Sequence, residues 1–403
     1  MSADPENPSI TGLPRSTRLL LRLAEKLPAG ELAVTVPDGR CFRFAGLQPG
    51  RSAELLLKTG RAGRRFLLGG HLGFAEAFLD GDWETPDLSA LLELGAQAQE
   101  AIGWRAFLGP RVRRLIERIG HLSRANTRRG ARRNIEAHYD LGNGFYEHWL
   151  DPGMTYSGAI FPDAGTDLEA AQNIKYRRLA ALLELRPEHH VLEIGCGWGG
   201  FAEHIAREHG CRVTAITISP AQHEYARARI RRAGLDDRVD VRLVDYRDID
   251  GRYDRIASIE MIESVGEAYW PTFFTALVRL LKADGIAALQ AITIADPLFA
   301  RYRRGADFIQ RHVFPGGMLP SPAMLKGMAD RFGLHCIADA GFGSHYARTL
   351  QDWRHRFEQA WPELQTMGFD ERFRRRWTYY LSYCEAGFRA ARLDLRQIAL
   401  RRA

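Results

Sequence analysis

A glycine-rich turn, with four glycines in six residues, forms the part of the chain best suited to hold a ligand. Residues 191–200 read Val-Leu-Glu-Ile-Gly-Cys-Gly-Trp-Gly-Gly, and residues 201–208 continue with helical spacing. Gly195, Gly197 and Gly200 lack a Cβ, so the backbone can turn tightly and a ligand can approach it closely. An apolar strand that turns through glycines into a helix predicts a nucleotide-type cofactor site.

Two cofactors compete for this turn. Its spacing satisfies the dinucleotide pattern, but that pattern expects an acid about 20 residues later, and the next strand ends in Ser219-Pro220. S-Adenosylmethionine fits better. Glu193 can face the ammonium group of its methionine part, Asp245 can accept a hydrogen bond from the adenine amine, and Tyr246 offers a face for stacking. A turn without any ligand is the third alternative.

The sequence around this turn predicts a parallel sheet covered by helices on both faces. From about residue 136, helical and strand patterns alternate, which is typical of an α/β fold. We expect residues 296–320 to form an inserted cap and 353–402 to be helical. The five expected strands are 191–194, 213–218, 239–244, 255–259 and 286–292.

The first 100 residues predict a small α+β domain. We expect an amphipathic helix at 15–27 and a hairpin of strands 31–36 and 40–44 around Pro37-Asp38-Gly39. Further strands are expected at 53–58 and 65–68, and helices at 74–79 and 88–94. The expected domains are therefore 1–100, a basic helical linker at 101–135, and a catalytic domain at 136–403.

Composition favours a cytoplasmic globular protein. Of the 403 residues, 45% are hydrophobic and 26% are charged, and the five cysteines are too widely spaced for a disulfide framework or a metal site. No run of 18 apolar residues predicts a membrane span, and no secretory leader is expected.

The net charge of +7 is concentrated in one segment. Between residues 104 and 133 we count ten arginines against one acid, with apolar residues at helical spacing. This pattern favours peripheral binding to an anionic membrane surface, here the inner one. Nucleic acid is the rival partner, but we find no nucleic-acid motif. A solvated connecting helix is the simpler alternative.

Residues 136–400 resemble the cyclopropane-fatty-acyl-phospholipid synthase family, which includes the mycolic acid methyltransferases. The order and spacing of the matches make the resemblance specific, and the first 100 residues more weakly resemble a small lipid-binding-like domain of some members. The matching stretches are 138–143 (His-Tyr-Asp-Leu-Gly-Asn), 151–157 (Asp-Pro-Gly-Met-Thr-Tyr-Ser), 191–200, 217–219 with Gln222, 245–247 (Asp-Tyr-Arg), 261–263 with 265–266, 314–321 (Phe-Pro-Gly-Gly-Met-Leu-Pro-Ser) and 345–350 (His-Tyr-Ala-Arg-Thr-Leu).

The resemblance implies a class I methyltransferase-like fold and methyl transfer from S-adenosylmethionine to a cis double bond of an unsaturated phospholipid acyl chain. The alkene takes the methyl group, a carbocation forms, and a base removes a proton so that a cyclopropane closes. The cation needs a dry pocket with aromatic faces and fixed negative charge. The residues implied to bind the cofactor are Tyr156, Ser157, Glu193, Gly195, Gly197, Thr217, Ile218, Gln222, Asp245, Tyr246 and Arg247.

The family's base is a bicarbonate ion held by a glutamate, a cysteine, a histidine, a backbone group and a tyrosine. Glu263 matches the glutamate, Tyr346 the tyrosine and Ile292 the backbone group. This chain has Gly158 where the cysteine is common and Gln290 where the histidine is common, and Ser264 also replaces a common histidine. Gly158 removes a donor and leaves space, and Gln290 cannot titrate, so the bicarbonate site is altered or lost.

These departures leave the product open. The cation can close to a cyclopropane, or lose another proton to give a methylene or methylated olefin that a partner reductase would convert to a methyl branch. A small-molecule methyltransferase and a lipid carrier with an inactive cofactor site are the rival functions, and a homodimer is left open. Aromatic residues expected to line an acyl tunnel are Tyr302, Phe308, His312, Phe314, Tyr379, Tyr380 and Phe388.

Overall fold

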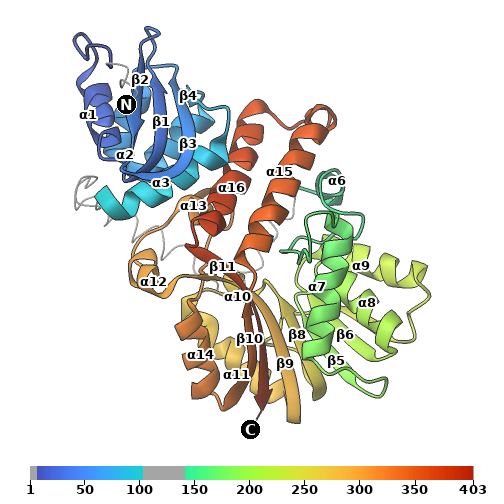
Figure 1. The fold of residues 1–403 in the computed structure, drawn as a ribbon. Helices are drawn as coiled ribbons and strands as arrows, with labels where there is room; N and C mark the ends of the chain where they lie inside the picture. Colours follow the sequence, from blue (N-terminus) through green and yellow to red (C-terminus); the bar gives the residue numbers. More distant parts are fainter. Residues whose placement is uncertain (1–6, 103–140, 403) are drawn as a thin grey trace. The chain divides into compact units, whose positions relative to one another are not determined.

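The computed structural model describes residues 7–102 and 141–402, which fall into two compact units (Figure 1). Unit 1 comprises residues 1–119 and 361–390, and unit 2 comprises residues 120–360 and 391–403. The basic linker predicted at 101–135 lies almost wholly outside the described residues. The predicted catalytic domain differs from unit 2 because residues 361–390 pack with the N-terminal segment.

Unit 2 is built on a seven-stranded sheet in the order β10-β11-β9-β8-β5-β6-β7. Strands β5 to β9 run parallel, and β11 lies antiparallel between β9 and β10. All five predicted strands are present. The strands are β5 (His190–Ile194), β6 (Arg212–Thr217), β7 (Val239–Leu243), β8 (Tyr253–Ile259), β9 (Leu281–Ile294), β10 (Leu334–Gly341) and β11 (Leu393–Arg402).

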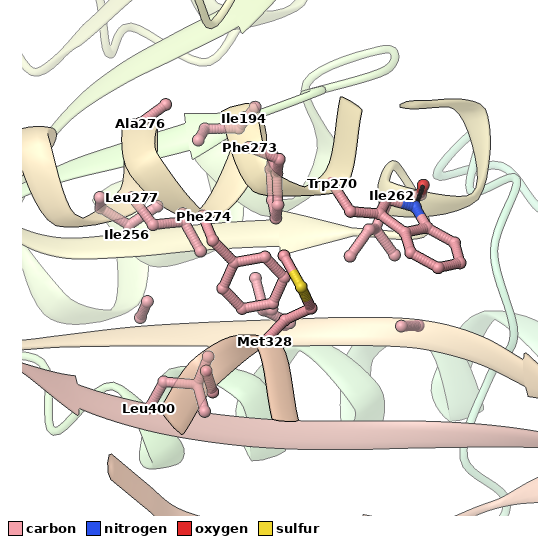
Figure 2. Close-up of a cluster of buried hydrophobic side chains, with 14 of the residues drawn as sticks. Ile194, Ile256, Ile262, Trp270, Phe273, Phe274, Ala276, Leu277, Met328 and Leu400 are labelled. Carbon is pink, nitrogen blue, oxygen red and sulfur yellow. Dashed lines mark hydrogen bonds between the residues drawn. The ribbon is translucent and has the colours of Figure 1, made fainter. Parts of the chain in front are cut away.

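Helices cover both faces of this sheet because its strands alternate apolar side chains between two cores. Val191 of β5 packs with helices α7 to α9, whereas Leu192 packs in the other core with α11 and α14. Figure 2 shows the second core, where Phe273 and Phe274 of α11 lie near Met328 of α14. The helices of unit 2 are α6 (Asn143–Glu147), α7 (Leu168–Leu182), α8 (Gly200–His209), α9 (Pro220–Arg232), α10 (Ile262–Val265), α11 (Trp270–Leu280), α12 (Asp296–Tyr302), α13 (Phe308–His312), α14 (Pro322–Arg331) and most of α15 (Gly343–Thr366).

Unit 1 is a small α+β layer. Its four-stranded sheet has the order β2-β1-β3-β4, and α16 packs against α2 and α3. The strands are β1 (Ala29–Thr35), β2 (Cys41–Ala45), β3 (Gln48–Leu57) and β4 (Trp83–Glu84). The helices are α1 (Arg15–Ala24), α2 (Arg61–Leu79), α3 (Leu88–Ile102) and α16 (Glu371–Arg389). No helix among residues 7–102 and 141–402 is long and apolar enough to cross a membrane.

Two secondary-structure predictions are wrong. Residues 65–68, predicted as a strand, belong to α2, which continues through a kink at Gly70. Residues 393–402, predicted as helical, form β11, because pairing on both sides with β9 and β10 outweighs the local pattern. Both segments are short runs in which helical and strand periodicities compete.

Candidate active site

One pocket lies at the carboxyl ends of β5, β6 and β8, where parallel sheets commonly bind ligands. The structure brings every predicted cofactor residue to its wall. These are Tyr156, Ser157, Glu193, Gly195, Gly197, Thr217, Ile218, Gln222, Asp245, Tyr246 and Arg247.

The glycine turn between β5 and α8 forms the floor of this pocket. Gly195, Gly197 and Gly199 have φ of +83°, +53° and +82°, a conformation that favours glycine. A Cβ at Gly197 would meet nothing within 4 Å, so the backbone there faces open space. The turn is held because the backbone N–H groups of Gly195 and Cys196 both donate to the carbonyl of Ile216 on β6. A ligand can therefore lie directly against this backbone.

Glu193 supplies a buried carboxylate at the end of β5. It is 2% exposed, and its Oε2 has no hydrogen-bond partner within the described part of the chain. Burial raises its pKa to about 8, and this is only partly offset by a hydrogen bond from the backbone of Ala202 and by the charges of Lys175 and Arg229. An unpartnered carboxylate in a pocket wall fits the ammonium group of S-adenosylmethionine.

The ribose and adenine sides of the pocket carry polar groups that are already oriented. Thr217 Oγ1 donates to Gln222 Oε1 at 2.9 Å, which fixes both side chains at the start of α9. Asp245 is paired with Arg247, whose Nε and Nη2 both donate to its carboxylate. Tyr246 lies beside this pair and packs edge-on against Phe273. These groups fit the hydroxyls and the amine of an adenosine.

A second polar cluster in the pocket is centred on Glu260, which directly follows β8. Its Oε1 accepts from the backbone N–H of Gly158 and from Gln290 Nε2, each at 2.8 Å. Its Oε2 accepts from Tyr346 Oη at 2.7 Å. The Gln290 amide is oriented because its Oε1 accepts from Gln397 Nε2 at 2.9 Å.

Glu260 has φ of +50°, the left-handed region that an L-residue rarely adopts. Such a conformation costs about 1–3 kcal/mol and persists only where the surroundings enforce it. Here the Glu260 backbone N–H donates to the carbonyl of Gln290 at 2.7 Å, and the carboxylate is held by three donors. Strain of this kind is often found at functional sites.

The structure corrects the predicted grouping of Glu263 with Tyr346 and Gln290. Both of those side chains bond Glu260, whereas Glu263 accepts from the backbone N–H of Ile292 and is not among the pocket-lining residues. Burial, and then the charge of Glu260, raise the pKa of Glu263 to about 8. Sequence reasoning missed Glu260, although an acid directly after a parallel strand is a signal that could have found it.

The expected space at Gly158 is also absent. A Cβ there would lie 2.6 Å from Leu395 Cδ2 and 2.9 Å from Tyr346 Cγ. Glycine is required because Tyr346 approaches the backbone closely on its way to Glu260. The group of Gly158 that donates to Glu260 is its backbone N–H.

Lys175 of α7 is a buried amine whose charge interacts with those of Glu260, Asp151 and Glu193. Its side chain is fully buried, and Nζ donates to Ser157 Oγ at 2.6 Å. Burial lowers its pKa to about 7, while the charges of Glu260, Asp151 and Glu193 raise it. The positive charge of Lys175 therefore interacts with three buried carboxyl groups.

The predicted aromatic tunnel is only partly present in unit 2. Phe314 lines the pocket, and Tyr156 packs against Trp353 with ring centroids 5.2 Å apart. Tyr302 instead receives hydrogen bonds from Gln310 and from the backbone of Leu319. Phe308 is buried and packs against His312, away from the pocket wall. The later aromatics lie on α16 in unit 1: Tyr379, Tyr380 and Phe388.

Comparison with known proteins agrees with this cofactor site. The family model described as mycolic acid cyclopropane synthetase matches residues 126–398. The chain is 38% identical over 397 residues to tuberculostearic acid methyltransferase UfaA1 of Mycobacterium tuberculosis, covering 96% of this chain and 90% of that protein. It is 34% identical over 392 residues to the cyclopropane-fatty-acyl-phospholipid synthase of Escherichia coli, covering 92% and 95%.

A solved structure shares the fold. Mycolic acid cyclopropane synthase CmaA1, complexed with SAH and CTAB, is 30% identical with a TM-score of 0.63, over 67% of this chain and 98% of that chain. One conclusion follows from the matched family model, from these relatives and from a pocket that fits an adenosine, an ammonium group and a methyl donor. The chain belongs to the mycolic acid cyclopropane synthetase family and is an S-adenosylmethionine-dependent methyltransferase.

Proposed function

We propose that this enzyme transfers the methyl group of S-adenosylmethionine to a cis double bond in an unsaturated acyl chain of a phospholipid. The observation that carries the proposal is the buried Glu260 cluster in the wall of the cofactor pocket. An alkene needs no base before it accepts a methyl group, but the resulting cation needs negative charge and a proton acceptor afterwards. The buried acid in the pocket wall can supply the negative charge that such a cation needs.

The chain's own residues divide this work. Glu193 and the glycine turn would hold the methionine part of the cofactor, and Thr217 with Gln222 would hold its ribose. The cofactor, when bound, supplies an electrophilic methyl group. Tyr156 and Phe314 line the pocket, and aromatic rings there can stabilise a cation and exclude water.

Two products fit this chemistry. Cyclopropane closure is the first, by likeness to the 34%-identical cyclopropane-fatty-acyl-phospholipid synthase. A methylene or methyl-branched chain is the second, favoured by the 38%-identical tuberculostearic acid methyltransferase and by Gly158 and Gln290 in place of the usual anion ligands. The ring and the methylene chain are isomers, so mass alone does not separate them. Proton NMR of the extracted lipid does, through cyclopropyl or terminal olefinic signals.

The test is incubation of the protein with methyl-labelled S-adenosylmethionine and vesicles of unsaturated phospholipid. We expect label in the acyl chains and none with saturated phospholipid of the same headgroup. Label that appears only in a polar small molecule from a cell extract would favour the small-molecule methyltransferase and overturn the proposal.

A further inference from the structure

The Glu260 carboxylate is the one acid of the pocket wall that receives hydrogen bonds from three separate segments of the described chain: Gly158, Gln290 and Tyr346. We propose that Glu260 is the base that removes the proton after methyl transfer, in place of a small anion taken from solution. This role rests on the methyl transfer to an alkene proposed above.

The hydrogen bonds leave the carboxylate able to accept a proton. Oε1 takes two hydrogen bonds, whereas Oε2 takes one, from Tyr346, and so keeps a free lone pair. Burial raises the pKa of Glu260, and the hydrogen bonds from Gln290, Tyr346 and Gly158 lower it. The pKa of Glu260 therefore lies above that of an exposed glutamate, which makes its carboxylate the stronger base.

A small anion bound at this position would need hydrogen bonds from the same three donors. Gly158 N–H, Gln290 Nε2 and Tyr346 Oη converge on one spot, and the Glu260 carboxylate fills it. The backbone of Glu260 is left-handed at this position, with φ +50°. The chain thus carries its own carboxylate at the place where these donors meet.

The step balances without another reactant. The carbon–carbon bond to the methyl group forms as the sulfur–methyl bond breaks, which leaves a cation on the neighbouring acyl carbon. Glu260 takes one proton from the transferred methyl group. The released electron pair closes the ring or, after a hydride shift along the chain, forms the methylene double bond. Glu260 ends protonated and returns its proton to solvent.

The chain offers a matched control residue. Glu184 is a second glutamate with a left-handed backbone, at φ +49°, but its side chain is 54% exposed and paired with Arg401. Glu184→Gln and Glu184→Gly therefore repeat the same changes of charge and backbone strain at a position that does not line the pocket. The test pairs are Glu260→Gln with Glu184→Gln, and Glu260→Gly with Glu184→Gly.

We expect Glu260→Gln to form the normal lipid product about 10² to 10⁴ times more slowly, the range lost with a general base. The trapped cation then reverts or is captured by water as a methyl-branched alcohol. Binding of S-adenosylhomocysteine, measured by calorimetry, stays unchanged and shows that the protein is folded. Glu184→Gln keeps wild-type turnover.

Rescue separates a chemical role from a structural one. Glu260→Gly opens the carboxylate site, so added bicarbonate, formate or acetate should restore turnover saturably, at least tenfold. Wild-type turnover should not depend on these anions. If the wild type is active and Glu260→Gln turns over within threefold of it, this inference alone is overturned. The same holds if Glu260→Gly binds S-adenosylhomocysteine but none of the anions restores its turnover. A wild type that labels no lipid would instead overturn the proposed function.

Discussion

Glu193 is the residue through which pH should control cofactor affinity. Burial raises its pKa to about 8 in the empty pocket, so most of it is protonated at pH 6. The cofactor's ammonium group favours the ionised carboxylate, so binding must release this proton. Affinity for S-adenosylhomocysteine should therefore rise up to tenfold per unit between pH 6 and 8. The rise should level off above about pH 8, where Glu193 is already ionised in the empty pocket.

Calorimetry at several pH values in two buffers of different ionisation enthalpy measures both the affinity and the proton release. Glu193→Gln should bind more weakly at pH 8 and should lose most of the slope. Lys175, whose pKa is lowered to about 7 by burial, also titrates in this range and would account for a residual slope. Equal slopes in wild type and Glu193→Gln would remove Glu193 from the cofactor site.

At the residue scale, the cofactor site could be read from the sequence because its residues follow strand ends. Gly195 directly follows β5, Thr217 ends β6 and Asp245 lies two residues after β7. The ends of such parallel strands meet at one edge of the sheet. The partners of Glu260 could not be read in this way. Gln290 lies inside β9 and Tyr346 lies in α15, so only the packed structure brings them together.

At the scale of elements, Gly158 controls how closely α15 approaches the loop before α7. An added Cβ would collide with Cγ of Tyr346. Because Cγ is the first ring atom after Cβ, a side-chain rotation cannot easily move it away. Gly158→Ala should therefore break the hydrogen bond from Tyr346 to Glu260, lower turnover, and reduce the free energy of unfolding by about 1–3 kcal/mol. Urea unfolding and the lipid assay measure the two effects.

Gly327 provides the control for this substitution. It lies within α14, and a Cβ there would meet nothing within 4 Å. Gly327→Ala should therefore raise the free energy of unfolding by about 0.5–1 kcal/mol through helix propensity and leave turnover unchanged. Gly158→Ala with wild-type stability and turnover would show that α15 adjusts freely, contrary to our account.

The elements also show where local pattern loses to tertiary pairing. The parallel strands β5 to β9 have apolar residues at successive or alternating positions, and all were predicted. The last strand, β11, contains Arg396, Arg401 and Arg402 among apolar residues and follows a helical stretch, so its pattern favours a continued helix. Its strand form depends on β9 and β10, which lie about 60 residues or more earlier in the chain and whose pairing no local window reports.

At the scale of the whole molecule, the phospholipid substrate that we propose would lie in a membrane. The arginine-rich segment at 104–133 lies outside the described residues, and its affinity for anionic lipid remains a prediction from charge. We expect sedimentation with vesicles that contain anionic phospholipid, and loss of binding in 1 M salt, where charges are screened within about 3 Å.

A variant with the ten arginines of 104–133 changed to glutamine should no longer sediment with anionic vesicles. Its turnover on phospholipid in detergent should stay near that of wild type, since the segment is not proposed to touch the reacting atoms. Equal binding of wild type to neutral vesicles, or full binding by the variant, would contradict an electrostatic role.

Labelled transfer to lipid tests most directly where the methyl group goes. With methyl-deuterated S-adenosylmethionine and vesicles of cis-unsaturated phospholipid, mass spectrometry should find acyl chains that retain two of the three deuterium atoms. Retention of two follows because one is lost to the base from the transferred methyl group. Acyl chains without deuterium, while S-adenosylhomocysteine accumulates with another acceptor, would contradict the account.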